Sequence, residues 1–154
     1  MSSYYFAYGS NMNPQRMAER GLKVIGQQAG KILGLRLAFN KRCAQEPTRS
    51  YANVMYDREG CVEGVLYKLS DPNEIIKMDH FEGAPRLYSR EIYWVDTGQE
   101  PIAAWVYVAN KAMLTEGLKP QGWYLEHLLA GKPFLTESYF DRLAATAILD
   151  TITS

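Results

Sequence analysis

The segment Tyr4–Asn13 reads YYFAYGSNMN and changes character twice within a few residues. Apolar and aromatic residues stop at Gly9-Ser10-Asn11, and a helical pattern begins directly afterwards. Backbone N–H groups of such a turn and of the first helical residues have no intrahelical partner, and they carry the positive end of the helix dipole. The segment therefore predicts a strand, a tight turn and a helix start that together bind a carboxylate or a phosphate.

Length and composition predict one globular domain that spans the whole chain, residues 1–154. An apolar share of 47% is typical of a folded protein rather than a disordered one. Seventeen basic residues balance seventeen acidic ones, and this zero net charge argues against nucleic acid or an anionic membrane as a partner. Cys43 and Cys61 match no metal-binding or redox spacing. No apolar stretch is long enough to cross a bilayer, so we expect a cytoplasmic protein.

Further strands are predicted by alternating or β-branched runs. The run Gly30–Asn40 alternates with a period close to two, and Gly34 within it predicts a bulge or a strong bend. A hairpin is predicted with Asp57–Gly60 as its turn. The strands of this hairpin and of a second pair are, in order, Tyr51–Tyr56, Cys61–Leu69, Tyr88–Asp96 and Ile102–Ala109.

Four helices are predicted from their capping signals. Asn13 caps a first helix that begins at Pro14 and ends at Gly21, and a late helix follows Pro120 and ends at Gly131. Asp71, Pro72 and Glu74 resemble a capping box for a helix that runs to about Glu82 and ends at Gly83. The last helix is expected from Thr136 to about Leu149, with these residues buried: Phe140, Leu143, Ala144, Ala147 and Ile148.

This order of elements favours an α+β fold, in which a mostly antiparallel, curled sheet carries helices on its outside. The alternation of strand and helix that makes a parallel sheet is missing, so a Rossmann-like dinucleotide site at the first turn is weakly supported. The turn also lacks the lysine and glycine spacing of a P-loop.

Glu82 is the best candidate for acid–base chemistry. On a helical wheel it shares a face with Ile75 and Met78, which is the face expected to point at the core. Burial and the negative end of the helix dipole both disfavour a charged carboxylate there, so its pKa should be raised toward neutrality. The alternative is that Glu82 turns outward or pairs with Arg86 or Arg90.

Other candidate residues have weaker support. His80 and His127 are expected to be surface or helix-face polar residues, and Ser10 has no identifiable His and Asp partners for a nucleophilic triad. Aromatic residues in the strands could stack nucleic-acid bases, but residues of this kind in strands are more often core. They are Tyr5, Phe6, Trp94, Trp105 and Tyr107.

Two segments together resemble a known family. YFAYGSNM at residues 5–12, followed by MDHFEGAPRLYSR at residues 78–90, is similar to the γ-glutamylcyclotransferase-like proteins, and GWYLEHLLAG at residues 122–131 is a looser third match. The resemblance covers nearly the whole chain in element order. It implies a small, mostly antiparallel β-barrel flanked by helices, and release of 5-oxoproline from a γ-glutamyl amino acid or γ-glutamyl amine.

The resemblance also implies roles for particular residues. Glu82 would be the catalytic acid and base, and the turn would hold the γ-glutamyl group, with Tyr88 and Tyr124 lining the pocket. The substrate-binding residues implied in the first segment are Tyr5, Phe6, Ala7, Tyr8, Gly9, Ser10 and Asn11. In this scheme the substrate's own α-amine attacks its γ-carbonyl, so no metal, cofactor or covalent nucleophile is required.

Several questions stay open from the sequence. The leaving group is undetermined, although the loop Lys41–Ser50, which contains Arg42 and Arg49, or the segment Thr115–Gly122 could contact it. A non-catalytic binding or interaction module on the same fold is the alternative to an enzyme, and the chain could be a homodimer. Arg16 is the only basic residue beside the turn, and an acidic Glu82 would repel phosphate, so a γ-glutamyl carboxylate is the expected ligand.

Overall fold

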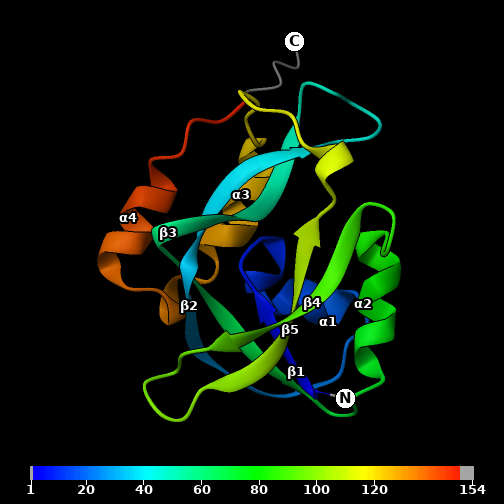
Figure 1. The fold of residues 1–154 in the computed structure, drawn as a ribbon, viewed down its shortest axis with the longest axis vertical. Coiled ribbons are helices and arrows are strands. Elements are labelled where there is room, and N and C mark those ends of the chain that lie inside the picture. Colours follow the sequence, from blue (N-terminus) through cyan, green and yellow to red (C-terminus); the bar gives the residue numbers. More distant parts are fainter. Residues whose placement is uncertain (1, 150–154) are drawn as a thin grey trace.

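A computed structural model describes residues 2–149 and gives their elements in the following order (Figure 1). They are β1 (Tyr4–Ala7), the 3-10 helix η1 (Ser10–Met12), α1 (Pro14–Glu19), β2 (Val24–Arg42), β3 (Ser50–Leu69), α2 (Glu74–Glu82), β4 (Tyr88–Val95), β5 (Ile102–Ala109), η2 (Lys111–Met113), α3 (Gly122–Leu129), η3 (Lys132–Phe134) and α4 (Glu137–Ala144). Within the described residues, no helix has the length and apolar character needed to span a membrane.

The strands form one five-stranded sheet in the order β2-β3-β1-β5-β4, which confirms the predicted α+β class. β1 is the central strand, antiparallel to β3 and parallel to β5, and the other two pairings are antiparallel. In Figure 1, α2 lies on one side of the molecule, and α3 and α4 lie on the other. The turn after β1 therefore begins at the middle of the sheet.

The sheet is not closed, so the expected β-barrel is an overstatement. Its two edges, β2 and β4, meet at a single backbone bridge, in which Lys31 and Asp96 exchange N–H···O bonds of 3.0 and 2.8 Å. Because β4 ends at Val95, immediately before this bridge, it offers β2 no continuous row of backbone groups to pair with.

The hairpin predicted at Asp57–Gly60 is wrong, because β3 continues through these residues. Both halves of β3 pair with the same long strand β2, and the pairing steps from Leu33 opposite Cys61 to Leu35 opposite Tyr56. Residues 57–60 therefore form a large bulge opposite Gly34, whose φ of 88° confirms the bend expected at this glycine. The polar residues Asp57–Gly60 are thus a bulge within one strand and not a turn that reverses the chain.

The helix starts are partly as predicted. The Asn13 side chain accepts a hydrogen bond from the Gln15 N–H at 3.1 Å, which confirms the cap of α1. The capping box of α2 is wrong, because Asp71 accepts from the Asn73 N–H and Glu74 accepts from the distant Lys23 N–H.

The last helix is shorter than expected. α4 ends at Ala144, and Tyr139 and Leu143 are its buried residues. Ala147 and Ile148 are exposed, because residues beyond 144 leave the helix and no longer follow its inward face, and Ala144, the last residue of the helix, is exposed as well.

Close approach between β1 and β3 holds the central strand in place. A Cβ built at Gly64 of β3 would lie 2.2 Å from the Ala7 carbonyl oxygen and 2.9 Å from the Phe6 ring. Phe6 itself is fully buried. Only glycine allows β1 to lie this close, and β1 leads directly into the turn.

We expect Gly64→Ala to lower the free energy of unfolding by about 1 to 3 kcal/mol, because the added methyl group must displace backbone rather than a flexible side chain. Urea denaturation followed by circular dichroism measures the change. Gly26→Ala on the paired strand β2 is the matched control, since a Cβ there makes only ordinary contact, 3.7 Å from the Lys68 Cβ. Equal stability of the two variants would contradict the assigned role of Gly64.

Candidate active site

The turn at Gly9–Asn11 presents unused backbone donors. The N–H groups of Met12 and Asn13 bond back to the Gly9 and Ser10 carbonyls, whereas the N–H groups of Gly9, Ser10 and Asn11 donate to no atom of the described residues. Gly9 is packed closely, since a Cβ there would lie 3.3 Å from the Tyr124 hydroxyl. The predicted strand, turn and helix start are therefore present, with free donors beside a cavity of about 240 Å³.

Asn11 ties this turn to helix α2. Its side-chain amide donates to the Tyr5 hydroxyl at 3.0 Å and to the Met78 sulfur at 3.3 Å, and its side-chain oxygen accepts from Arg20 at 3.3 Å. The Asn11 carbonyl accepts from the Tyr67 hydroxyl at 2.6 Å. Met78 is four residues before Glu82, so this network fixes the end of α2 relative to the turn.

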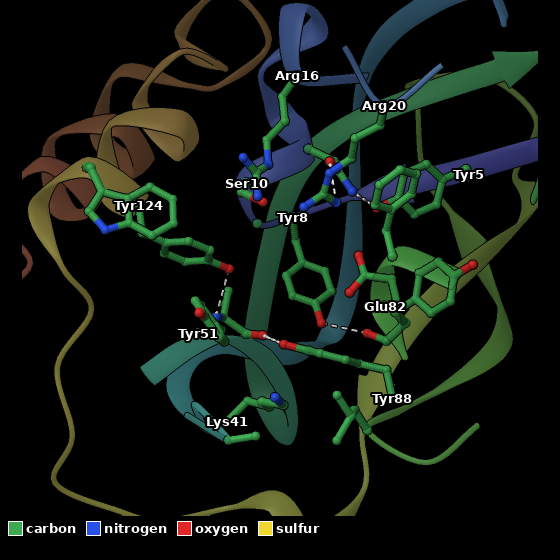
Figure 2. A pocket seen from close by; sticks show the side chains of 18 of the residues that line it. Tyr5, Tyr8, Ser10, Arg16, Arg20, Lys41, Tyr51, Glu82, Tyr88 and Tyr124 are labelled. Carbon is green, nitrogen blue, oxygen red and sulfur yellow. Dashed lines mark hydrogen bonds between the residues drawn. The ribbon is translucent and has the colours of Figure 1, made fainter. Parts of the chain in front are cut away.

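Glu82 is the last residue of α2, and its side chain lines the cavity (Figure 2). Ile75 and Met78 are fully buried, as expected for the face that Glu82 shares. Within residues 2–149, no hydrogen bond or ion pair engages its carboxylate. The alternative pairing with Arg90 is wrong, because Arg90 lies 3.1 Å from Asp79 instead.

The environment of Glu82 makes it a stronger base than an ordinary glutamate. Desolvation by the surrounding protein raises the pKa of the Glu82 carboxyl to about 7. Arg20, Arg16 and Lys41 oppose this rise through their positive charges, but they do not overcome it. The carboxylate can therefore gain or lose a proton near neutral pH.

Tyrosine side chains form much of the cavity wall. The Tyr8 hydroxyl donates to the Tyr107 carbonyl, and the Tyr88 hydroxyl donates to the Ala52 carbonyl at 2.9 Å. The Tyr124 hydroxyl accepts from the Ala52 N–H at 3.0 Å. Burial raises the pKa of Tyr8, Tyr88 and Tyr124, so these phenols stay neutral at physiological pH.

Most of the residues expected at the site do line this cavity: Tyr5, Tyr8, Gly9, Ser10, Asn11, Glu82, Tyr88 and Tyr124. Phe6 and Ala7 do not. Successive side chains of a strand point to opposite faces, so Phe6 points away from Tyr5 and packs near Gly30 and Gly64. Ala7 is buried in the core, with its carbonyl against Gly64.

Basic side chains are more numerous at the site than the sequence indicated. Arg16 lines the cavity as expected of a residue beside the turn, and Arg20 and Lys41 line it too. Arg20 is four residues after Arg16, so their shared helical face was a usable signal. Lys41, Ala44 and Gln45 belong to the segment 41–50, which the sequence suggested as a contact of the leaving group. The lining residues that sequence reasoning did not assign to a pocket are Arg20, Tyr51, Ala52, Phe81, Leu87, Tyr107 and Trp123.

The remaining candidates lie away from the cavity lining. Arg42 donates to the Thr115 hydroxyl at 3.3 Å, and neither Arg42, Arg49 nor the segment 115–122 lines the cavity. The His127 ring bonds to the Asn13 side chain at 3.0 Å, at the start of α1. In the part of the chain that the structure describes, no group of three or more His, Cys, Asp or Glu residues could hold a metal ion.

Solved structures share this fold. A γ-glutamyl cyclotransferase matches with a TM-score of 0.84 and 22% identity, over 100% of this chain and 93% of its own. An uncharacterised human protein matches with a TM-score of 0.83 and 23% identity, over 98% and 91%. A yeast γ-glutamyl cyclotransferase specific to glutathione matches with a TM-score of 0.66 and 12% identity, over 91% and 93%.

Sequence comparison gives a more specific result than fold. A search of curated proteins found no match. The sequence profile of one family, described as γ-glutamyl cyclotransferase, AIG2-like, matches residues 5–126 and so includes the turn, Glu82 and Tyr124. This chain therefore belongs to the AIG2-like γ-glutamyl cyclotransferase family.

Proposed function

We propose that this protein is an enzyme that releases 5-oxoproline from a γ-glutamyl compound, with Glu82 as its general acid and base. One observation carries the proposal: an unpaired carboxylate with a pKa of about 7 faces a cavity that also contains the free N–H groups of the turn. Membership of the cyclotransferase family supports the same reaction class.

The γ-glutamyl group carries an α-carboxylate and an α-ammonium, and the cavity offers a partner of opposite charge for each. We assign the α-carboxylate to the side where the turn N–H groups, Arg16 and Arg20 lie. Arg16 supports this assignment because its Nε is buried without a hydrogen-bond partner among the described residues. The α-ammonium then lies toward Glu82, which must accept its proton.

Proton transfer through Glu82 balances the reaction. The α-ammonium gives a proton to Glu82, and the neutral amine attacks the γ-carbonyl and forms the new C–N bond. The attacking nitrogen loses a second proton, the old C–N bond breaks, and the leaving nitrogen gains both protons and departs as an ammonium. A group with a pKa near 7 can serve in both directions. The neutral phenols of Tyr8 and Tyr88 line the same space without competing for these protons.

The cavity also favours ring closure by shape. Holding the γ-glutamyl chain folded brings the amine and carbonyl together, and well-oriented intramolecular reactions gain about 7 to 11 kcal/mol from such positioning. The turn N–H groups that do not hold the carboxylate can donate to the oxyanion that forms at the γ-carbonyl.

Replacement of Glu82 tests the proposed chemistry. We expect Glu82→Gln to lower kcat about 10²- to 10⁴-fold, because glutamine keeps the shape but transfers no proton. The measurement is 5-oxoproline release from a panel of γ-glutamyl amino acids and amines. Glu91→Gln, an exposed residue of β4, is the matched control and should keep the parent rate. Turnover by Glu82→Gln near the parent rate, or binding without product by the parent, would contradict the proposal.

The pH–rate profile provides an independent test. We expect kcat/KM to rise as the pH increases through about 7, because the free enzyme must hold Glu82 ionised to accept the substrate's proton. This acidic limb should vanish from the residual activity of Glu82→Gln. A midpoint near pH 4.5, the ordinary value for glutamate, would contradict the raised pKa of Glu82, and an acidic limb that survives in Glu82→Gln would show that another group titrates.

The raised pKa of Glu82 should also make protein stability depend on pH, and this can be measured without any substrate. The Glu82 pKa is about 4.5 in the unfolded chain and about 7 in the folded one, so the folded state binds the proton more tightly. Its contribution to stability is full below about pH 4.5 and is lost as the pH rises through about 7.

Glu82→Gln cannot ionise, so we expect its free energy of unfolding to exceed that of the parent by about 1 to 3 kcal/mol at pH 8 and to match it at pH 4.5. Urea denaturation at the two pH values measures both differences. Glu91→Gln, at an exposed position, is measured beside it as the matched control. A Glu82→Gln variant that is less stable than the parent at pH 8 would mean that the folded protein favours the charged carboxylate.

A further inference from the structure

Lys41 is a buried residue whose ammonium has no partner in the proposed reaction, although its charge lowers the pKa of Glu82. Lys41 is only 3% exposed, and its side chain lines the same cavity as Glu82. Among the described residues, no carboxylate lies within ion-pairing distance of its ammonium, and no hydrogen bond engages it. Its neighbours are the rings of Tyr51 and Tyr88, whose centroids lie 5.4 and 5.6 Å away.

A β-bulge turns Lys41 into the cavity. In β2 the pairing steps from Ala38 opposite Asn53 to Lys41 opposite Tyr51, which leaves one extra residue on β2. Asn40 and Lys41 are consequently both buried, although successive residues of a regular strand point to opposite faces. Bulges commonly re-aim a side chain beside an active site.

The Lys41 ammonium faces the cavity without a charged or hydrogen-bonding partner among the described residues, so a partner for its charge is still missing. The aromatic faces beside Lys41 stabilise part of its charge. The cavity still has an excess of positive charge, because Arg16, Arg20 and Lys41 face a single carboxylate among its described lining residues. A γ-glutamyl group linked to a neutral amine has no net charge, whereas one linked to an amino acid carries an additional carboxylate. The cavity therefore complements a substrate with net negative charge.

The placement of the three cations separates their tasks. In Figure 2, Arg16 and Arg20 reach into the cavity from the side of the turn, and Lys41 reaches in from the opposite side, with Tyr8 and Glu82 between them. In the proposed function, the α-carboxylate binds on the side of the turn, near Arg16 and Arg20. Lys41 is left facing the part of the substrate beyond the γ-carbonyl.

We propose that Lys41 determines specificity by binding a carboxylate on the leaving group, so that γ-glutamyl amino acids or peptides are preferred over γ-glutamyl derivatives of neutral amines. This inference rests on the proposed function and defines the substrate class of the same site. Lys41 takes no part in proton transfer, and the released amino acid departs with its carboxylate unchanged.

The test combines removal of the Lys41 ammonium with removal of the leaving-group carboxylate from the substrate. γ-Glutamyl-alanine and γ-glutamyl-ethylamide differ only by the leaving-group carboxylate, and 5-oxoproline release is measured for each at about pH 8.5, above the pKa of Glu82. The parent should favour γ-glutamyl-alanine about 10- to 100-fold in kcat/KM, the range for one charge-assisted hydrogen bond. Lys41→Met should abolish this preference through KM, so that the ratio of kcat/KM for the two compounds falls to about 1. Lys41→Arg should restore part of the preference.

Lys31→Met is the matched control, since Lys31 is an exposed lysine of the same strand. Equal losses for both substrates in Lys41→Met would place Lys41 at the γ-glutamyl end and overturn the proposal, as would a parent with no preference. Thermal melting of each variant separates lost folding from lost recognition.

Calorimetric binding of the same two compounds separates this inference from the proposed function. If neither compound is turned over, but the parent binds γ-glutamyl-alanine more tightly and Lys41→Met does not, the specificity role stands and the cyclotransferase reaction fails. Product from both compounds at equal kcat/KM supports the reaction and overturns the role of Lys41. Absence of both product and binding preference overturns both.

Discussion

The hydrogen bonds of Asn11 couple the two halves of the site. One amide side chain contacts Tyr5 on the central strand, Met78 on α2 and Arg20 after α1, and the backbone carbonyl of the same residue receives the Tyr67 hydroxyl. A buried side-chain amide whose nitrogen and oxygen are both hydrogen-bonded strongly specifies a single arrangement. The turn and the end of α2, far apart in sequence, are thereby held against the same cavity.

Two opposing electrostatic effects set the chemistry of that cavity. Desolvation favours the neutral form of Glu82, and the nearby Arg20, Arg16 and Lys41 favour its charged form. Their balance leaves the pKa of Glu82 at about 7. This value lies between that of an exposed carboxylate and that of a buried carboxylate without nearby cations. The same cations give the cavity an excess of positive charge. A single set of residues therefore tunes the base and favours anionic ligands.

The shared fold and the family membership support different statements about this protein. Solved structures with 12 to 23% identity share the architecture, and a fold of this kind can carry more than one activity. The family profile spans the turn and Glu82, which are the residues used by the proposed ring closure. The remaining wall of the cavity includes Lys41, Tyr51 and Trp123, which come from separate elements, and the proposed substrate preference rests on this wall.

The sequence by itself determined the local features that depend on neighbouring residues. Capping by Asn13, the bend at Gly34, the end of α2 at Gly83 and the pairing of β4 with β5 follow from turn chemistry and periodicity, which act within a few residues. The shared helical face of Ile75, Met78 and Glu82 likewise follows from helix geometry alone, and it identified the carboxylate that lines the cavity.

Only the tertiary structure decided how these pieces combine. Whether Asp57–Gly60 reverses the chain or bulges depends on β2 pairing with both halves of β3, and whether the sheet closes depends on where β4 ends. The exclusion of Phe6 from the cavity and the inward turn of Lys41 depend on strand pleat and on a register shift between two strands. Such features arise from pairing between distant segments, and no local pattern of residues encodes which segment will be the partner.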